Sequence, residues 1–237
     1  MHYKEQFVKF LLESGALTFG DFTLKSGRKS PYMINAGKLD SGVTLSRLGC
    51  FYARAIYDKM ELDIIPWETT MLFGSSYKGI PLATSAAIAM GAAFDLDFGW
   101  AFNRKEAKDH GEGGVFVGRK PAEGDRILIV DDVMTAGTAL RGTVDLLQEH
   151  APKAKIVGSV IAVDRKERGR DERLSAIAEA QYELGIPIFS IINIDEMLLI
   201  LKSADFELKY KEEAKAELPT VEQIARIEEY LAANRPS

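Results

Sequence analysis

Two adjacent carboxylates, Asp131 and Asp132, stand between a short apolar run and a turn of small residues. The run, residues 127–130, has no polar position, which is typical of a parallel strand covered on both faces. The turn, residues 135–138, leads into an expected helix near Ala139, whose first N–H groups favour an anion. Such an arrangement suits a phosphorylated sugar, because carboxylates accept hydrogen bonds from its hydroxyls while the turn holds its phosphate. The alternatives are an acidic pair that caps the next helix and the acidic metal site of a receiver-like or phosphatase-like domain.

The composition is that of an ordinary globular protein. With 237 residues, 46% of them hydrophobic and 27% charged, the chain can build one sizeable core. A net charge of −5 argues against broad nucleic-acid binding. A single cysteine, Cys50, excludes an internal disulfide, fits a reducing compartment and is expected in the core. Neither the charged start nor the low-charge run at 80–94 fits a secretory signal or a membrane span. We therefore expect a cytoplasmic protein with neither nucleic acid nor membrane as a partner.

The elements that must position the acidic pair follow a regular order. Residues 3–14 predict an amphipathic helix, and residues 16–40 alternate around a Ser-Gly-Arg-Lys turn as in a β-hairpin. From residue 69 to residue 200 strands and helices alternate, which predicts a parallel sheet with helices on both faces and right-handed crossovers. The expected strands are 69–74, 98–102, 115–117, 126–130, 155–163 and 187–192, and the expected helices in and around this region are 41–60, 80–93, 140–150, 174–185 and 195–201.

We expect one integrated domain in three parts. Residues 1–60 form a hood of helix and hairpin with a packing helix, residues 61–203 form the α/β core, and residues 204–237 form a helical extension. The extension carries one apolar stripe, made of Val221, Ile224, Ile227 and Leu231. It contains no chemical motif.

Charged segments lie near the predicted carboxyl ends of several strands. Residues 103–114 are charged and glycine-rich without hydrophobic periodicity, so we expect a loop that is mobile until a ligand binds. By charge pattern alone this segment, the hairpin turn around Lys25, the turn at 74–83 and the run at 164–169 are each typical of a solvated surface. In an acidic protein, however, the cluster of Arg104, Lys105, Lys108 and His110 lies next to a motif that favours a polyphosphate.

The stretch 127–139 resembles the phosphoribosyl-diphosphate (PRPP) binding motif of type I phosphoribosyltransferases, in which an apolar run leads into Asp-Asp and Thr-x-Gly-Thr. The resemblance implies a Rossmann-like α/β fold with a parallel sheet and a small N-terminal hood. It also implies that the ribose hydroxyls and the 5-phosphate of PRPP contact one contiguous set of residues. These are Asp131, Asp132, Val133, Met134, Thr135, Ala136, Gly137, Thr138 and Ala139.

Three further segments resemble orotate phosphoribosyltransferases: residues 22–35, the pattern Arg-Lys-x-x-Lys-x-His-Gly at 104–111, and Asp-Arg-x-Glu-Arg-Gly at 164–169. The resemblance implies that Lys25 reaches the reaction centre and that Arg165, Met33, Ile34 and Thr135 contact the base. The family usually has two aromatic residues at the positions of Met33 and Ile34. If ring stacking is needed there, base affinity should fall by about 1 kcal/mol. The implied diphosphate contacts are Tyr77, Lys78, Arg104, Lys105, Lys108 and His110.

The resemblance implies the reaction of orotate with PRPP to give orotidine 5′-monophosphate and diphosphate, a pentosyl transfer in pyrimidine and UMP biosynthesis. Lys25, Lys108, Asp131 and Asp132 are the implied catalytic residues, and Mg²⁺ would be carried on the diphosphate without a direct protein ligand. A homodimer that shares the 103–114 loop between subunits is also implied. The alternatives are a phosphoribosyltransferase for another base, against which the Lys25 segment argues, and a PRPP-sensing regulator, which should carry a basic nucleic-acid face.

Overall fold

A six-stranded sheet in the order β5-β4-β3-β6-β7-β8 organises the fold. In this computed structural model, residues 2–24, 26–108, 114–134, 137–213 and 216–236 are described, without the side chains of 105–108 and 212–213. The strands are β3 Met71–Gly74, β4 Gly99–Lys108, β5 Gly114–Gly118, β6 Arg126–Val133, β7 Lys155–Asp164 and β8 Ile188–Asn193. Strands β4, β3, β6, β7 and β8 run parallel to one another, and β5 pairs with β4 antiparallel. The predicted α/β fold with a mainly parallel sheet is confirmed.

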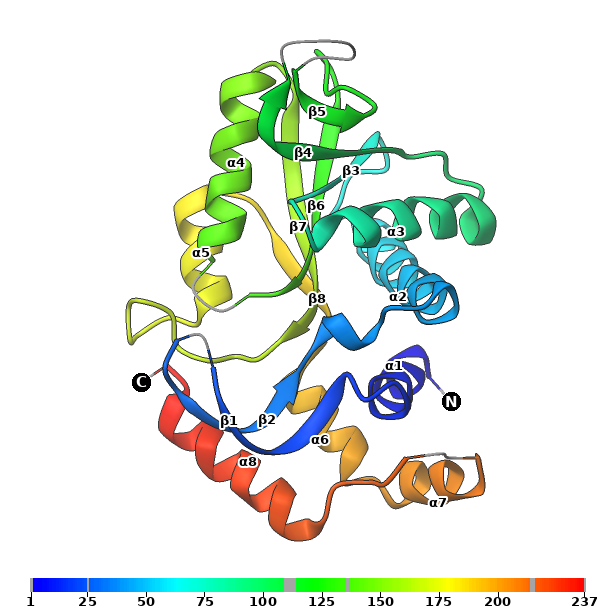
Figure 1. Cartoon of the computed structure of the whole chain (residues 1–237), viewed down its shortest axis with the longest axis vertical. Helices are drawn as coiled ribbons and strands as arrows, with labels where there is room; N and C mark the ends of the chain where they lie inside the picture. Colours follow the sequence, from blue (N-terminus) through cyan, green and yellow to red (C-terminus); the bar gives the residue numbers. More distant parts are fainter. Residues whose placement is uncertain (1, 25, 109–113, 135–136, 214–215, 237) are drawn as a thin grey trace.

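Strand β6 lies between β3 and β7 and is buried on both faces. Its residues 127–130 are at most 1% exposed, as the unbroken apolar run predicts. Leu128 and Val130 join the core on the side of α2 (Gly42–Glu61) and α3 (Gly79–Phe94). Ile127 and Ile129 join the core on the side of α4 (Thr138–His150) and α5 (Ala176–Leu184). Figure 1 shows these two pairs of helices on opposite sides of the sheet.

The N-terminal hood consists of α1 (Tyr3–Glu13) and an antiparallel hairpin of β1 (Leu17–Thr23) and β2 (Lys29–Ile34). A short 3-10 turn, η1 (Ala36–Lys38), connects it to α2. The predicted helix and hairpin are thus confirmed. The hairpin and α1 gather at the end of the molecule opposite the tip of β4 and β5 (Figure 1).

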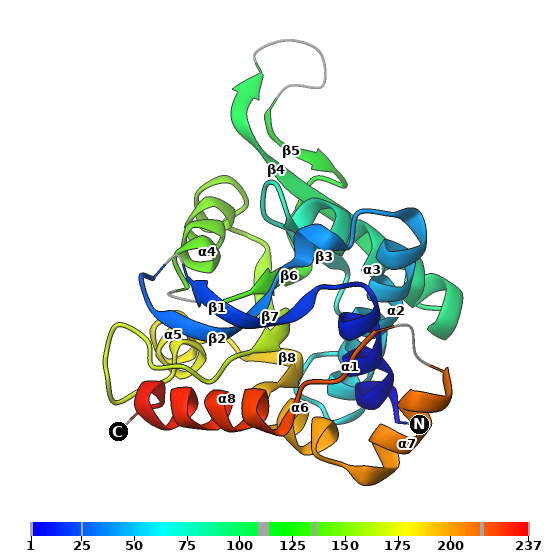
Figure 2. The same ribbon diagram turned by 60° about the horizontal axis from the view of Figure 1, so that its bottom comes forward.

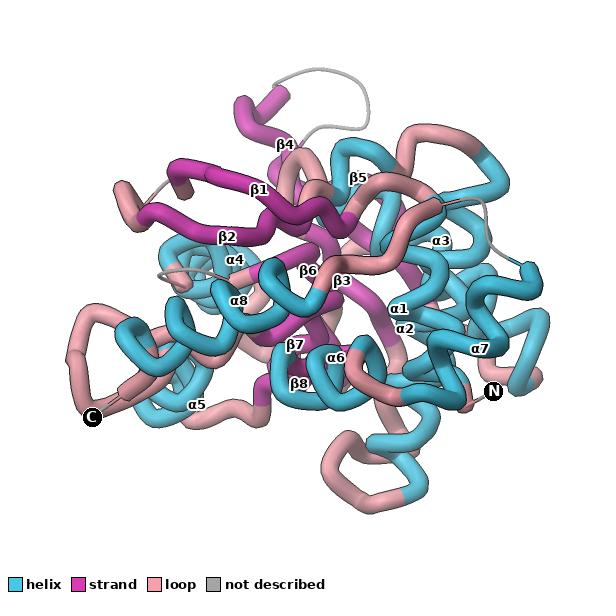
Figure 3. The backbone as a smooth tube through the Cα atoms, turned by 90° about the horizontal axis from the view of Figure 1, so that it is seen from below, coloured by secondary structure: helices cyan, strands magenta, loops and turns pink. Residues whose placement is uncertain are grey.

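The C-terminal segment packs against this hood. After α6 (Ile194–Leu201), helices α7 (Ala204–Glu213) and α8 (Val221–Asn234) follow, and α8 lies along β2 (Figure 3). Ile227 and Leu231 are at most 2% exposed in the same core cluster as α1, as their stripe predicts. Val221 is 86% exposed, so the buried part of the stripe does not extend to it. As the first residue of α8, it lies at the end of the helix, beyond the buried contact.

Two further expectations are corrected. Strand β4 does not end at Phe102 but continues to Lys108, where it pairs with Gly114 of β5. Backbone pairing needs no apolar side chain, so charge and glycine content did not reveal this strand. Figure 2 shows the two strands projecting from the body of the molecule. Residues 109–113, with the expected mobile tip, lie outside the described residues. Cys50 is exposed on α2, because the buried side of that helix passes through its neighbours Gly49 and Phe51.

Candidate active site

The acidic pair lies at the carboxyl end of β6, as predicted. Asp132 is 7% exposed, and its Oδ2 accepts a hydrogen bond from Lys78 Nζ at 2.6 Å. Asp131 Oδ1 accepts the backbone N–H of Asp132 at 2.9 Å, and the carbonyl of Asp131 accepts the hydroxyl of Tyr52 at 2.6 Å. The strand, α2 and the loop before α3 therefore hold the two carboxylates in place.

The two carboxylates differ in their electrostatic environment. Burial, with the adjacent Asp132 second, raises the pKa of Asp131 to about 6, although a backbone hydrogen bond, Lys78 and Ser75 oppose the shift. A carboxylate that loses water without a full set of donors is costly to ionise. Asp131 can therefore gain from a ligand that brings hydroxyl donors, such as a ribose.

The anion-binding site predicted at the turn 135–138, here called the cradle, follows the acidic pair directly in the chain. Gly137 takes a left-handed conformation with φ of 69°, and α4 begins at the next residue. This left-handed backbone conformation favours glycine at the turn. A Cβ there would come within 2.6 Å of the Arg141 guanidinium, the flexible end of a side chain that could move aside. A pocket of about 220 Å³ opens here, lined by Asp131, Val133, Met134, Gly137, Thr138, Ala139, Leu140, Ser159 and Ile161. Thr135 and Ala136, two of the predicted contacts, lie outside the described residues.

The predicted diphosphate loop connects β3 to α3 and carries Tyr77 and Lys78. Its ends approach so closely that a Cβ on Gly74 would stand 2.0 Å from the Gly79 carbonyl oxygen. The Ser76–Tyr77 peptide bond is cis, and Ser76 N–H donates to Asn103 Oδ1 of β4 at 3.0 Å. Tyr77 is 65% exposed. The loop thus joins the acidic pair, through Lys78, to the strand that bears the basic cluster.

Of that basic cluster, the structure describes only the side chain of Arg104. Its Nε is buried, and no hydrogen-bond partner for it exists among the residues that the structure covers. Lys105 and Lys108 lie on β4 with undescribed side chains, and His110 lies outside the described residues. Their predicted roles remain predictions.

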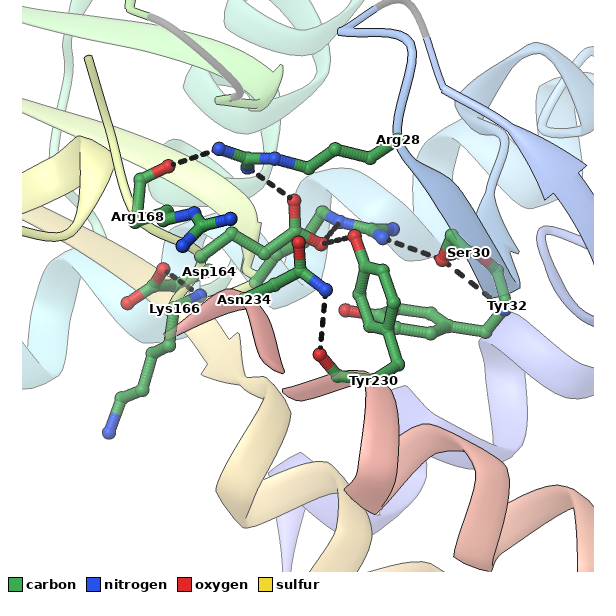
Figure 4. Close-up of polar contacts among 10 residues, drawn as sticks. Arg28, Ser30, Tyr32, Asp164, Lys166, Arg168, Tyr230 and Asn234 are labelled. Carbon is green, nitrogen blue, oxygen red and sulfur yellow. Dashed lines mark hydrogen bonds and ion pairs between the residues drawn. The ribbon is translucent and has the colours of Figure 1, made fainter. Parts of the chain in front are cut away.

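Arg165 follows β7, the strand next to β6, so the predicted base arginine and the acidic pair lie at the ends of neighbouring strands. It is 5% exposed. Its Nε donates to Glu167 Oε1 at 2.7 Å and its Nη2 donates to Ser30 Oγ at 3.0 Å. The guanidinium carbon lies 4.1 Å from the ring centroid of Tyr32 (Figure 4). Hairpin and sheet therefore meet at this arginine.

The hairpin places Met33 and Ile34 at the end of β2, both half-buried. Lys25 lies outside the described residues. Sequence reasoning missed the network around Arg165. Ser30, Tyr32 and Glu167 contact it directly, and Arg28 and Tyr230 bond to Glu167. Glu167 stood within the quoted Asp-Arg-x-Glu-Arg-Gly pattern and was the one available signal. Nothing in the helical pattern of the tail indicated Tyr230.

The acidic pair, Asp131 and Asp132, can be tested for its fit to the Mg²⁺ ion that the resemblance implies. Among the described residues no group of three or more potential ligands is assembled for a metal ion. Mg²⁺ commonly keeps several waters and binds through one or two carboxylates together with substrate phosphates. Asp131 and Asp132, beside a cradle for an anion, fit an ion that arrives with a diphosphate.

Comparison with known proteins adds a family to this geometry. The model of the phosphoribosyl transferase domain family matches residues 51–178. The chain is 47% identical over 232 residues to the orotate phosphoribosyltransferase of Aeromonas salmonicida, covering 97% of each chain. It is 49% identical over 208 residues to that of Pseudomonas aeruginosa, covering 87% of this chain and 92% of the relative. The crystal structure of orotate phosphoribosyltransferase from Francisella tularensis superposes with a TM-score of 0.75 at 32% identity, covering 97% and 99%.

The sheet, the cradle after β6 and these matches define the type I phosphoribosyltransferase fold. Sequence identity of 47–49% over most of the chain to these two relatives shows which family within this class is meant. The chain belongs to the orotate phosphoribosyltransferase family. None of the helices in the described ranges has both the length and the apolar composition that a bilayer crossing requires.

Proposed function

We propose that this pocket carries out the reaction of its family, in which orotate and PRPP become orotidine 5′-monophosphate and diphosphate. The observation that carries the proposal is the junction of β6 and α4. There Asp131, whose carboxylate is costly to ionise, and Gly137, which precedes the first turn of α4, line one pocket. The reaction is a pentosyl transfer in pyrimidine biosynthesis. Loss of orotate absorbance in the presence of PRPP and Mg²⁺ tests it directly. Turnover of adenine or uracil in place of orotate would reject the assignment of the base.

Charge separation at C1 of the ribose sets the task of the acidic pair. As the C1–O bond breaks, positive charge grows on the sugar, and the field of Asp131 and Asp132 favours it. The same carboxylates accept the ribose 2- and 3-hydroxyls. The N–H groups of Gly137, Thr138 and Ala139 and the hydroxyls of the turn hold the 5-phosphate.

Negative charge grows on the departing diphosphate, and the basic residues stabilise that charge. Lys78, now paired with Asp132, is near enough to exchange that partner for the diphosphate. Arg104 offers a buried nitrogen that has no described partner. Tyr77, Lys105, Lys108 and His110 complete the set, and Mg²⁺ bound to the diphosphate adds charge neutralisation. Preorganised contacts of this kind commonly supply several kcal/mol of transition-state stabilisation, about 3 to 4 for one donor.

Base recognition falls to the hood and to the end of β7. Arg28 and Arg165 both donate to Glu167, so these two cations and one anion together carry a net charge of +1. Such a cluster suits the anionic orotate. Arg165 engages a carboxylate or carbonyl oxygen of the base, Met33 and Ile34 contact it through their peptide groups, and Thr135 and Lys25 lie beside it, so that N1 faces C1.

The assembly that fits this chemistry is a cytoplasmic homodimer in which the 103–114 segment serves the partner's site. The projection of β4 and β5 from the body of the chain supports it (Figure 2). Mixing Lys108→Ala subunits with Asp132→Asn subunits, both of low activity, tests the sharing. Activity above the mean of the two separate variants is expected, since each mixed dimer regains one intact site. Activity no higher than that mean would reject the sharing.

A further inference from the structure

Glu167 is the centre of the polar network at the base arginine. It is 6% exposed and receives three side-chain donors. Arg165 Nε reaches its Oε1 at 2.7 Å, and Arg28 Nη1 reaches its Oε2 at 3.2 Å. The third donor is the hydroxyl of Tyr230, which reaches Oε1 at 2.8 Å. Oε1 therefore holds Arg165 on one side and the C-terminal helix α8 on the other. Figure 4 shows Tyr230 and Asn234 of that helix close to Arg28 and Arg168.

Helix α8 is attached to the same segment at a second point. The backbone N–H of Arg168 donates to the carbonyl of Asn234 at 2.8 Å. Asn234 Nδ2 in turn donates to the carbonyl of Tyr230 at 2.8 Å, which links both attachments within the last turn of α8. The end of the helix thus fixes both the side chain of Glu167 and the backbone one residue further on.

The bond from Tyr230 has a defined direction. Burial raises the pKa of Tyr230, and the neighbouring Glu167 carboxylate raises it further, by more than the adjacent Arg165 lowers it, so the hydroxyl stays protonated and donates. The ring of Tyr230 meets that of Tyr32 edge to face, with centroids 6.2 Å apart. Tyr32 supplies the face on which the Arg165 guanidinium stacks. Tyr230 therefore supports Arg165 along two routes, through the carboxylate and through the ring.

Orientation matters more for a guanidinium than for a point charge. Its donors form a planar fork, and a bidentate contact to a carboxylate or carbonyl is lost when that plane rotates. Arg165 has its plane fixed by Glu167 at Nε, by Ser30 at Nη2 and by the ring of Tyr32. Of these three groups, Glu167 accepts further hydrogen bonds from Arg28 of the hairpin and from Tyr230 of helix α8.

We propose that Tyr230 is a positioning residue for base recognition, which orients Arg165 toward a planar anionic base by fixing the carboxylate of Glu167. The inference rests on the proposed contact between Arg165 and orotate. It gives the C-terminal helix a part in substrate specificity, although Tyr230 itself touches no substrate.

Tyr230→Phe tests the proposal because it removes the hydroxyl and keeps the ring contact with Tyr32. The KM for orotate should rise about three- to tenfold, which is less than the full effect of a hydrogen bond to a charged group, because this bond acts on orotate only through Glu167 and Arg165. The KM for PRPP should stay within about twofold, because the acidic pair and the cradle keep their contacts. The dissociation constant of orotidine 5′-monophosphate should rise by the same factor as the KM for orotate.

Tyr210→Phe is the matched control in the same tail. Tyr210 of α7 is 1% exposed, and no hydrogen-bond partner for its hydroxyl is present in the described part of the chain. Loss of that hydroxyl should change neither KM. A purely structural tail would make the two variants alike in their kinetics.

A double variant tests the route of action. Because Tyr230 acts through Arg165, adding Tyr230→Phe to Arg165→Lys should raise the KM for orotate no further than Arg165→Lys alone. Additive losses, an unchanged orotate KM in the single variant, or equal rises for orotate and PRPP would each overturn the proposal. Failure of the proposed function would instead appear in the wild-type protein, as the absence of orotate turnover.

Discussion

The two halves of the candidate site are built in opposite ways. The ribose half, from Asp131 to Ala139, is one contiguous stretch at a single strand-to-helix junction. The base half joins three parts of the chain that are far apart in sequence, namely the hairpin, the segment after β7 and helix α8. Its buried groups bond to one another, whereas the ribose half keeps a carboxylate that is costly to ionise. Local sequence therefore encodes the first half, and tertiary packing encodes the second.

The largest expected effect is in the ribose half. Asp132→Asn should lower kcat/KM for PRPP by about 100-fold, because a hydrogen bond to a charged group contributes about 1.5–3 kcal/mol and the pairing with Lys78 is lost as well. The Tm should change little. Asp145→Asn, which alters an exposed carboxylate on α4, the helix that follows Asp132 in the chain, is the control. Steady-state kinetics unchanged from the wild type would remove Asp132 from the ribose site.

In the base half, loss of function should come with loss of stability. Glu167→Gln leaves Arg28 and Arg165 without their shared carboxylate. The free energy of unfolding should therefore fall by about 3 kcal/mol and the Tm by about 6 to 10 °C. The KM for orotate should rise about tenfold. Thermal unfolding and initial rates measure both effects. Glu172→Gln changes a glutamate with a 77% exposed side chain in the same loop and should leave both unchanged.

The third prediction concerns a residue that belongs to neither half. Lys108→Ala should lower kcat at least tenfold with the fold intact, because it removes a cation that stabilises the leaving diphosphate. The KM for orotate should hardly move. Lys120→Ala, at an exposed lysine beyond β5, provides the comparison. Turnover near that of the wild type in single-turnover and steady-state assays would reject the role of this strand in catalysis.

The smallest expected effect sharpens the contrast in stability. Folding raises the pKa of Asp131 from its ordinary value of 3.8 to about 6, so the folded state binds more protons between these values. The contribution of Asp131 to the free energy of unfolding should therefore fall as the pH rises from 4 to 6 and remain low above it. The full shift corresponds to about 3 kcal/mol, and solvent screening at this half-buried side chain reduces it. Asp131→Asn, which carries no such charge, should be more stable than the wild type by about 1 to 2 kcal/mol at pH 8 and equal to it near pH 4. A stability difference that is the same at both pH values would contradict the burial of this charge.

The fold was predictable where one element carries its own pattern. The apolar run of β6 and the helical stripe of α1 each specify an element without help from the rest of the chain. The extension of β4 to Lys108 was not predictable, because it depends on pairing with β5 rather than on its own side chains. The exposure of Cys50 depends on which side of α2 meets the core, and a small residue gives little indication of that.

The site follows the same division. The order of Asp131, Asp132 and Gly137 favoured a phosphosugar site, because chemistry and spacing lie together in the chain, while a helix cap and a metal site remained as alternatives until the resemblance was considered. Arg165 needed a resemblance to be distinguished from a solvated charge. Tyr230 could not be found, because 63 residues separate it from Glu167 and only the packing of α8 on β2 brings them together.

The position of Tyr230 in the chain has a consequence for biosynthesis. A ribosome makes the β6–α4 junction well before it makes α8. The proposed orientation of Arg165 therefore depends on a segment made later than the proposed sugar site, and a tag fused directly behind Asn234 would lie next to the residues proposed to recognise the base.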